Sequence, residues 1–79
     1  MKYLYFSADW CGPCRMLGPV MNEVSQKVPV QKINVDKDSD MAQKYNVRNI
    51  PTVVLVNGDA EVTRFIGVNP KQVYLDAVN

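Results

Sequence analysis

The chain has 79 residues, 47% of them apolar and 22% charged, and its nine basic and eight acidic side chains give a net charge of +1. This size and composition predict one globular domain over residues 1–79. The charges are scattered, and no apolar stretch approaches the ~20 residues that cross a bilayer, so we expect no nucleic-acid or membrane partner. The N-terminal residues do not resemble a signal peptide, and we expect a cytoplasmic protein.

The first half of the chain predicts a strand, a long helix and a second strand. Residues 2–6 are apolar and rich in aromatic side chains, as in a strand that is buried on both faces. Apolar positions then lie three or four residues apart, which predicts an amphipathic helix from Cys11 onward: Leu17, Val20, Met21, Val24 and Val28. Pro13 suits its first turn, whereas Pro19 lies inside it and should kink it. Residues 30–35 form the second predicted strand.

A short helix and a hairpin follow. Asp38 or Ser39 can cap this helix, whose inner face is expected to hold Met41, Ala42 and Tyr45. Residues 52–56 are β-branched or apolar throughout and predict a third strand. Asn57-Gly58 comes directly after it and predicts a type I′ turn, in which both residues need a positive φ.

The chain ends on a return strand over residues 61–66 and a last helix. Asn69 is predicted as the N-cap of that helix and Pro70 as its first residue, and its buried side chains are expected to be Val73, Tyr74 and Ala77. The element order is therefore β-α-β-α-β-β-α. The first two strands must be parallel, with a right-handed crossover, and the last two antiparallel. We expect an α/β fold with a four-stranded mixed sheet flanked by helices.

The candidate site is Cys11-Gly12-Pro13-Cys14, which lies where the first strand passes into the long helix. Unpaired N–H groups and the helix dipole stabilise a thiolate at a helix N-terminus, and the thiolate is the nucleophilic form. Cys11 is therefore predicted to be the attacking and more exposed thiol. Cys14 lies one turn further on and is predicted to resolve the mixed disulfide.

Three other interpretations compete for the cysteine pair. A zinc site needs about four ligands, and the chain has two cysteines and no histidine, which leaves only a site shared between molecules. Haem attachment needs a histidine where Arg15 stands. A purely structural disulfide remains open, although closing so short a loop stabilises a fold little.

A family resemblance then becomes specific. Trp10-Cys11-Gly12-Pro13-Cys14 resembles the active-site motif of the thioredoxin family, and residues 48–52 (Arg-Asn-Ile-Pro-Thr) are similar to its cis-proline segment, with Asn57-Gly58 and Gly67 also matching. The resemblance covers residues 1–79 and implies the minimal thioredoxin fold, without the strand and helix that usually precede this core.

The resemblance also implies a set of binding residues. It implies that Pro51 is cis and lies against the cysteines, so that the Ile50 backbone can pair with an extended substrate. The side chains and backbone expected around the sulfur atoms are Trp10, Gly12, Pro13, Ile50, Pro51 and Val68. Lys32 matches a lysine that lies near the buried site in the family, and a solvated lysine at the edge of the sheet is the alternative interpretation.

One position departs from the family pattern. Tyr5 stands where thioredoxins commonly carry a buried aspartate that helps to deprotonate the second cysteine. A phenol is a poor base at neutral pH but can donate a hydrogen bond. Lys32, a water molecule or the leaving thiolate could then take the proton of Cys14.

These observations predict a monomeric oxidoreductase that reduces protein disulfides without a metal or organic cofactor and is recharged by a reductase of the thioredoxin-reductase type. A glutaredoxin-like protein recharged by glutathione is the alternative enzyme, although Gly12-Pro13 and Ile50 differ from the residues typical of glutaredoxins. A binding module that keeps the fold and holds partners without catalysis is the alternative outside enzymes.

Overall fold

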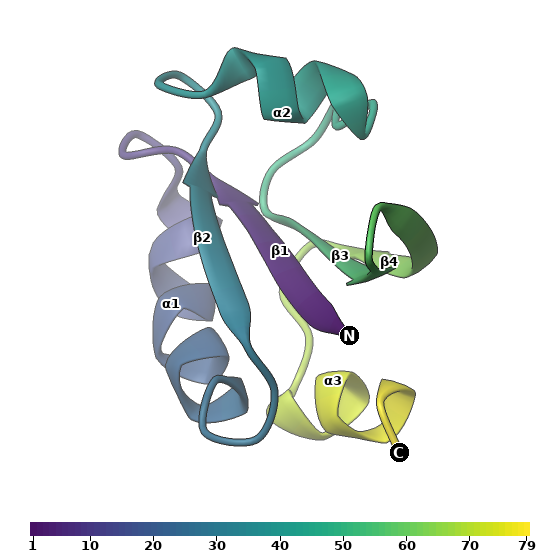
Figure 1. Ribbon diagram of the computed structural model, residues 1–79. Coiled ribbons are helices and arrows are strands. Elements are labelled where there is room, and N and C mark those ends of the chain that lie inside the picture. The colour runs from purple at the N-terminus through teal and green to yellow at the C-terminus, as the bar shows by residue number, and fades with distance from the viewer.

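The computed structural model describes residues 1–79, and its element order is the predicted one (Figure 1). The elements are β1 (Lys2–Ser7), α1 (Gly12–Val24), β2 (Val30–Asn34), α2 (Ser39–Lys44), β3 (Thr52–Asn57), β4 (Ala60–Ile66) and α3 (Lys71–Ala77). The strands form one sheet in the order β2-β1-β3-β4. β1 pairs with β2 in parallel, and the β1–β3 and β3–β4 pairs are antiparallel, which confirms the mixed four-stranded sheet.

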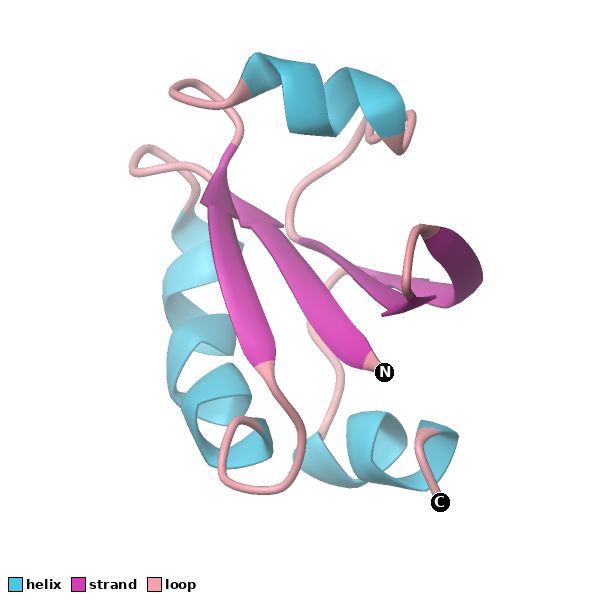
Figure 2. Cartoon of the chain, in the orientation of Figure 1, coloured by secondary structure: helices cyan, strands magenta, loops and turns pink.

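The central strands β1 and β3 bury both of their faces, as the apolar run at residues 2–6 predicts. Successive side chains of a strand point to opposite faces, so Tyr3 and Tyr5 pack with residues of α1 and α3, whereas Leu4 and Phe6 pack with residues of α2. Figure 2 shows the three helices around the sheet. Two hydrophobic cores result, one on each face of the sheet.

The predicted N-cap of the last helix and the predicted turn of the hairpin are both wrong by one residue. Pro70, not Asn69, is the N-cap of α3, and no side chain caps this helix. Asn69 instead directs its amide nitrogen to the Tyr74 hydroxyl at 3.5 Å. In the hairpin, Asn57 still pairs with Ala60, so the turn residues are Gly58 and Asp59, and only Gly58 has a positive φ. A positive φ at the first turn residue alone is the requirement of a type II′ turn rather than type I′.

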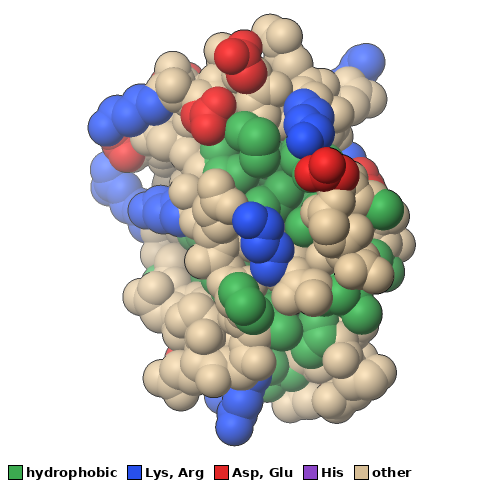
Figure 3. Space-filling model, in the orientation of Figure 1, with side chains coloured by type: hydrophobic (Ala, Val, Ile, Leu, Met, Phe, Trp, Pro, Cys, Tyr) green, Lys and Arg blue, Asp and Glu red, His purple; other side chains and the backbone are tan.

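The surface carries both signs of charge. On the face drawn in Figure 3, acidic side chains lie mainly in the upper half of the view, lysine and arginine side chains are scattered over the whole face, and patches of hydrophobic side chains lie between them. None of the three helices is long and apolar enough to cross a membrane. Asp38 caps α2 as predicted, because its side chain accepts the Met41 backbone N–H.

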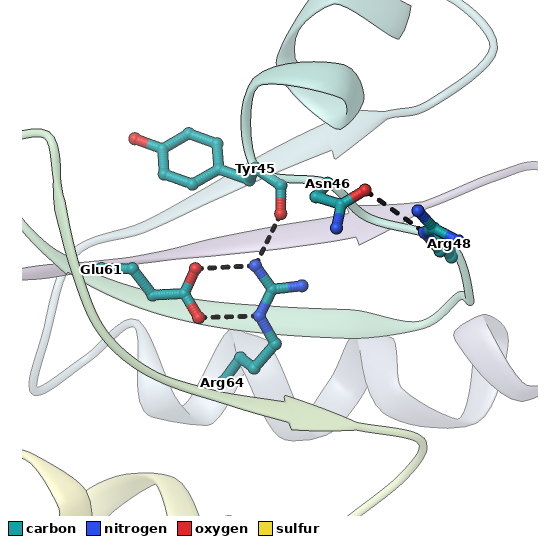
Figure 4. A network of polar contacts seen from close by, with 5 residues as sticks. All are labelled: Tyr45, Asn46, Arg48, Glu61 and Arg64. Atoms are coloured by element: carbon teal, nitrogen blue, oxygen red, sulfur yellow. Dashed lines mark hydrogen bonds and ion pairs between the residues drawn. The ribbon is translucent and has the colours of Figure 1, made fainter.

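Arg64 connects the β3–β4 hairpin to the end of α2 through hydrogen bonds (Figure 4). Arg64 in β4 forms two hydrogen bonds of 2.7 Å to the carboxylate of Glu61 and donates a third, of 2.6 Å, to the Tyr45 backbone carbonyl. Next to it, Arg48 donates to the Asn46 side chain at 3.3 Å. The hydrogen bonds from Arg64 lower the pKa of Glu61 below its usual value of 4.5.

This pair predicts a small loss of stability in acid. Because the Glu61 pKa is lower in the folded than in the unfolded state, its carboxylate stabilises the fold at every pH above the unfolded pKa of 4.5. This contribution disappears as the pH falls through the lower, folded pKa. The pair is partly exposed, so we expect Glu61→Gln to cost at most about 1 kcal/mol at neutral pH. Urea unfolding from pH 3 to 7 should show wild type and Glu61→Gln converging in acid. Asp59→Asn, which alters a far more exposed carboxylate, is the control, and equal pH slopes for all three proteins would contradict the prediction.

Candidate active site

Cys11 and Cys14 are joined by a disulfide at the start of α1, with their Cα atoms 5.3 Å apart. The backbone of Cys11 is extended, with φ −86° and ψ 109°, as an N-cap residue requires. Its Sγ accepts a hydrogen bond of 3.2 Å from the Cys14 backbone N–H. The sulfur of Cys11 therefore takes the place that a serine or aspartate oxygen takes at an ordinary helix N-cap.

The expected difference in exposure between the cysteines is wrong for this disulfide-bonded form, because each is 4% exposed. Both pack with Ala8 in a small apolar cluster, and Val35 and Ile50 cover that cluster from outside. What distinguishes the two sulfur atoms is therefore the backbone N–H that faces Cys11. Val35 follows β2, and nothing in its local sequence indicates a place beside the cysteines.

Trp10 is 70% exposed, as its place in a loop beside Asp9 predicts, and its indole is hydrogen-bonded to a residue that the sequence did not single out. Its Nε1 donates to Asp36 Oδ2 at 2.8 Å. The parallel pairing of β1 with β2 sets Ser7 opposite Asn34, so the loops that follow the two strands lie side by side (Figure 1). Asn34, the last residue of β2, also donates to Asp9 Oδ1, in the loop after β1, at 3.3 Å. The carboxyl ends of parallel strands meet at one edge of a sheet, which is the signal that could have indicated Asp36.

The proline segment lies on the other side of the disulfide. The Ile50–Pro51 bond is cis, as the resemblance implies, and Pro51 is buried. Half-buried Ile50 packs against the cysteine cluster. The Pro51 carbonyl accepts the Gly67 N–H at 2.9 Å, which places Val68 beside this segment. Gly12 and Pro13 are exposed in the first turn of α1, between the two cysteines. Of the predicted binding residues outside the motif, Ile50 packs on the cysteine cluster, and Pro51 and Val68 lie next to Ile50.

A cavity of about 440 Å³ lies beside Cys14. Its walls come from the end of β1, the start of α1 and β2: Tyr5, Ser7, Ala8, Asp9, Cys14, Arg15, Gly18 and Lys32. Lys32 lines this cavity from the edge strand β2, and its side chain is exposed. The larger cavity, about 610 Å³, lies between the ends of α1 and α3 and contains neither cysteine. No group of three or more side chains that could bind a metal ion is present.

The geometry can be compared with that of known proteins. The family model described as Thioredoxin matches residues 2–79. The chain belongs to the thioredoxin family. A thioredoxin of Chlamydia pneumoniae is 39% identical over 77 residues, which are 94% of this chain and 76% of that protein. A thioredoxin of Synechocystis sp. is 44% identical over 70 residues, 84% of this chain and 65% of that protein. The chain thus spans about two thirds to three quarters of these relatives.

Solved structures agree with this assignment. A thioredoxin variant from Halobacterium salinarum superimposes with a TM-score of 0.88 at 36% identity, over 96% of this chain and 69% of that one. A thioredoxin from Nicotiana alata gives 0.87 at 39% identity, over 96% and 68%. The predicted family and fold are confirmed. With its cysteine pair bonded at the start of α1, this thioredoxin-family chain is a thiol–disulfide oxidoreductase.

Tyr5, at the departure from the thioredoxin pattern, donates its hydroxyl to the Cys14 backbone carbonyl at 2.6 Å. Burial raises its pKa above the usual 10, the neighbouring Ser7 hydroxyl offsets part of this rise, and the Tyr74 phenol adds to it. Tyr5 is therefore a neutral hydrogen-bond donor at physiological pH and cannot take a proton from Cys14.

Tyr5→Phe is expected to destabilise the oxidised protein by about 1–2 kcal/mol, because the Cys14 carbonyl loses a buried donor. Its rate of disulfide reduction should stay within about twofold of wild type, since a neutral phenol does not act as the base. Urea unfolding and a turnover assay at pH 7 measure the two effects. A large loss of activity at unchanged stability would mean that the phenol takes part in the chemistry.

Proposed function

We propose that this protein reduces the disulfides of protein substrates, with Cys11 as the nucleophile and Cys14 as the resolving thiol. The observation that carries the proposal is the N-cap position of Cys11, whose Sγ accepts the Cys14 N–H. A backbone donor and the helix dipole both favour negative charge on this sulfur, so the Cys11 thiolate should form more readily than a free thiolate.

The reaction then has two exchange steps. The Cys11 thiolate attacks one sulfur of the substrate disulfide, and the second substrate sulfur leaves as a thiolate and takes up a proton. The Cys14 thiolate next attacks Cys11 Sγ, the mixed disulfide breaks, and the first substrate sulfur leaves with its electron pair. The substrate gains two electrons and two protons, and Cys11 and Cys14 become a disulfide.

The surface around the pair supports a protein substrate. Trp10 and Val68 are exposed apolar side chains, and Gly12 and Pro13 leave the first turn of α1 without bulky cover. An exposed apolar surface of this kind suits docking of a polypeptide. We propose that Ile50 and Pro51 present backbone to an extended substrate segment and that the protein acts as a monomer.

A reductant of protein disulfides needs an electron donor that restores its dithiol. We propose a flavoprotein reductase of the thioredoxin-reductase type as that donor and the cytoplasm as the place of action, because dithiols are kept reduced there. The test is turnover of a disulfide-bonded protein with NADPH and thioredoxin reductase, compared with NADPH, glutathione and glutathione reductase. Turnover only with glutathione would assign the glutaredoxin-like alternative, and no turnover in either system would favour the binding module.

A further inference from the structure

We propose that the Ser7 hydroxyl donates a hydrogen bond to the Cys14 thiolate and so favours that thiolate in the resolving step. The proposal rests on the function above, in which Cys14 attacks the mixed disulfide. Ser7 is the last residue of β1, is 3% exposed and lines the cavity beside Cys14. Its Oγ is the only buried side-chain oxygen or nitrogen without a hydrogen-bond partner.

An unpaired buried hydroxyl is unusual, because nearly all buried polar groups in folded proteins find a partner. Thr52 is the other buried polar residue and follows the rule, because its Oγ1 donates to the Asn49 carbonyl. Ser7 lies close enough to the Tyr5 hydroxyl to lower the pKa of that phenol as a weak hydrogen-bond donor does, but the contact does not have the geometry of a full hydrogen bond. The Tyr5 proton is already committed to the Cys14 carbonyl.

The remaining polar side chains of the cavity have other contacts or face water. Asp9 accepts a hydrogen bond from Asn34, and Arg15 donates to the Asp9 carbonyl at 3.3 Å. The Lys32 side chain is exposed and forms no hydrogen bond or ion pair within the protein. Water therefore screens all three charges, whereas Ser7 is shielded from it. Among the polar side chains that line this cavity, Ser7 carries the one buried hydroxyl without a full hydrogen bond.

The disulfide-bonded state explains why Ser7 lacks a partner. A disulfide sulfur carries no charge and is a weak acceptor, whereas a thiolate is a strong one. Ser7 would therefore gain a partner only when Cys14 is a thiolate. This happens twice in the cycle: just before Cys14 attacks the mixed disulfide, and when a reductant opens the Cys11–Cys14 bond and Cys14 is the leaving group. A donor placed in advance favours the charged state without reorganisation. Ser7 keeps its proton, and the Cys14 proton leaves through the cavity to solvent.

The direct test is the pKa of Cys14, measured from its Cβ chemical shift in a Cys11→Ser background. Ser7→Ala should raise this pKa by about one unit, because a hydrogen bond to the charged form is lost. Ser7→Thr, which keeps the hydroxyl, should restore it. Ser39→Ala, at an exposed serine without side-chain hydrogen bonds, is the matched control. An unchanged pKa of Cys14 in Ser7→Ala would overturn the proposal. So would a Ser7→Ala substitution that no longer shifts this pKa once Tyr5 is replaced by Phe, since Ser7 would then act through the phenol.

The rate of the resolving step gives a second readout, in the chain with both cysteines. A thiol of higher pKa is ionised less at pH 7, but its thiolate is intrinsically more nucleophilic. Ser7→Ala should therefore resolve a preformed mixed disulfide about threefold more slowly than wild type at pH 7, where ionisation limits the rate, and faster than wild type at pH 10. Structural damage alone would slow the step at both pH values, and that result would contradict the proposal. The pKa measurement needs no turnover, so a protein that fails to reduce any substrate would refute the proposed function and leave the Ser7 test intact.

Discussion

Replacing Cys11 by serine is expected to lower the rate of protein-disulfide reduction by at least about a thousandfold, because a hydroxyl cannot replace a thiolate as nucleophile. Serine is a preferred N-cap residue, and its hydroxyl can accept the Cys14 N–H that Cys11 Sγ accepts in wild type. The start of α1 should therefore stay intact, and the loss should be chemical. Turnover of a disulfide-bonded protein with the reductase system measures it.

The control for this prediction is folding without the disulfide. Urea unfolding of Cys11→Ser should match that of reduced wild type, since neither has the Cys11–Cys14 bond. Activity within tenfold of wild type in such a folded variant would mean that Cys14 can attack the substrate, and the proposed roles of the two thiols would be wrong.

Replacing Tyr74 by alanine is expected to cost about 3–5 kcal/mol of stability, as other large-to-small substitutions of buried aromatic residues do. Tyr74 in α3 is fully buried, and its ring meets those of Tyr3 and Phe65 edge to face, with centroids 5.8 Å and 5.3 Å away. The Tyr3 hydroxyl also donates to the Tyr74 carbonyl at 2.8 Å. This one side chain thus joins α3 to β1 and β4.

A loss of this size is a large part of the 5–15 kcal/mol by which small domains are stable. Urea unfolding of the oxidised proteins measures it, with Tyr74→Phe as the matched control. Phenylalanine keeps the ring contacts and loses only the long contact of 3.5 Å with Asn69, so its cost should stay near 1 kcal/mol or less. A Tyr74→Ala variant within 1 kcal/mol of wild type would show that α3 contributes little to the fold.

The order of strands and helices could be predicted because hydrophobic periodicity is local. The spacing of Leu17, Met21 and Val24 predicts the buried face of α1, and all three side chains are buried. The exact residues of the hairpin turn and of the α3 N-cap were predicted one position too early, because contacts outside these dipeptides set them. At the hairpin, the pairing of Asn57 with Ala60 set which residues turn, and the dipeptide pattern did not.

The candidate site divides in the same way. The motif around Cys11 and the family resemblance predicted the cysteine pair and the proline segment. Contacts between distant segments do not follow from local patterns: the Trp10–Asp36 hydrogen bond follows only from the parallel pairing of β1 with β2, and Val35 and Ile50 pack on the two buried cysteines from segments far along the chain. Ser7 was not predicted either, because a lone serine has meaning only beside the cavity that it lines.

The most direct test of the proposed mechanism compares the two single cysteine variants. Each is mixed with a disulfide-bonded protein under native conditions, and the products are then separated by denaturing, non-reducing electrophoresis. Cys14→Ser retains the attacking thiol and lacks the resolving one, so it should accumulate a mixed disulfide that dithiothreitol releases. Cys11→Ser lacks the attacking thiol and should accumulate none. A mixed disulfide that forms with Cys11→Ser and not with Cys14→Ser would contradict the assignment of Cys11 as the nucleophile.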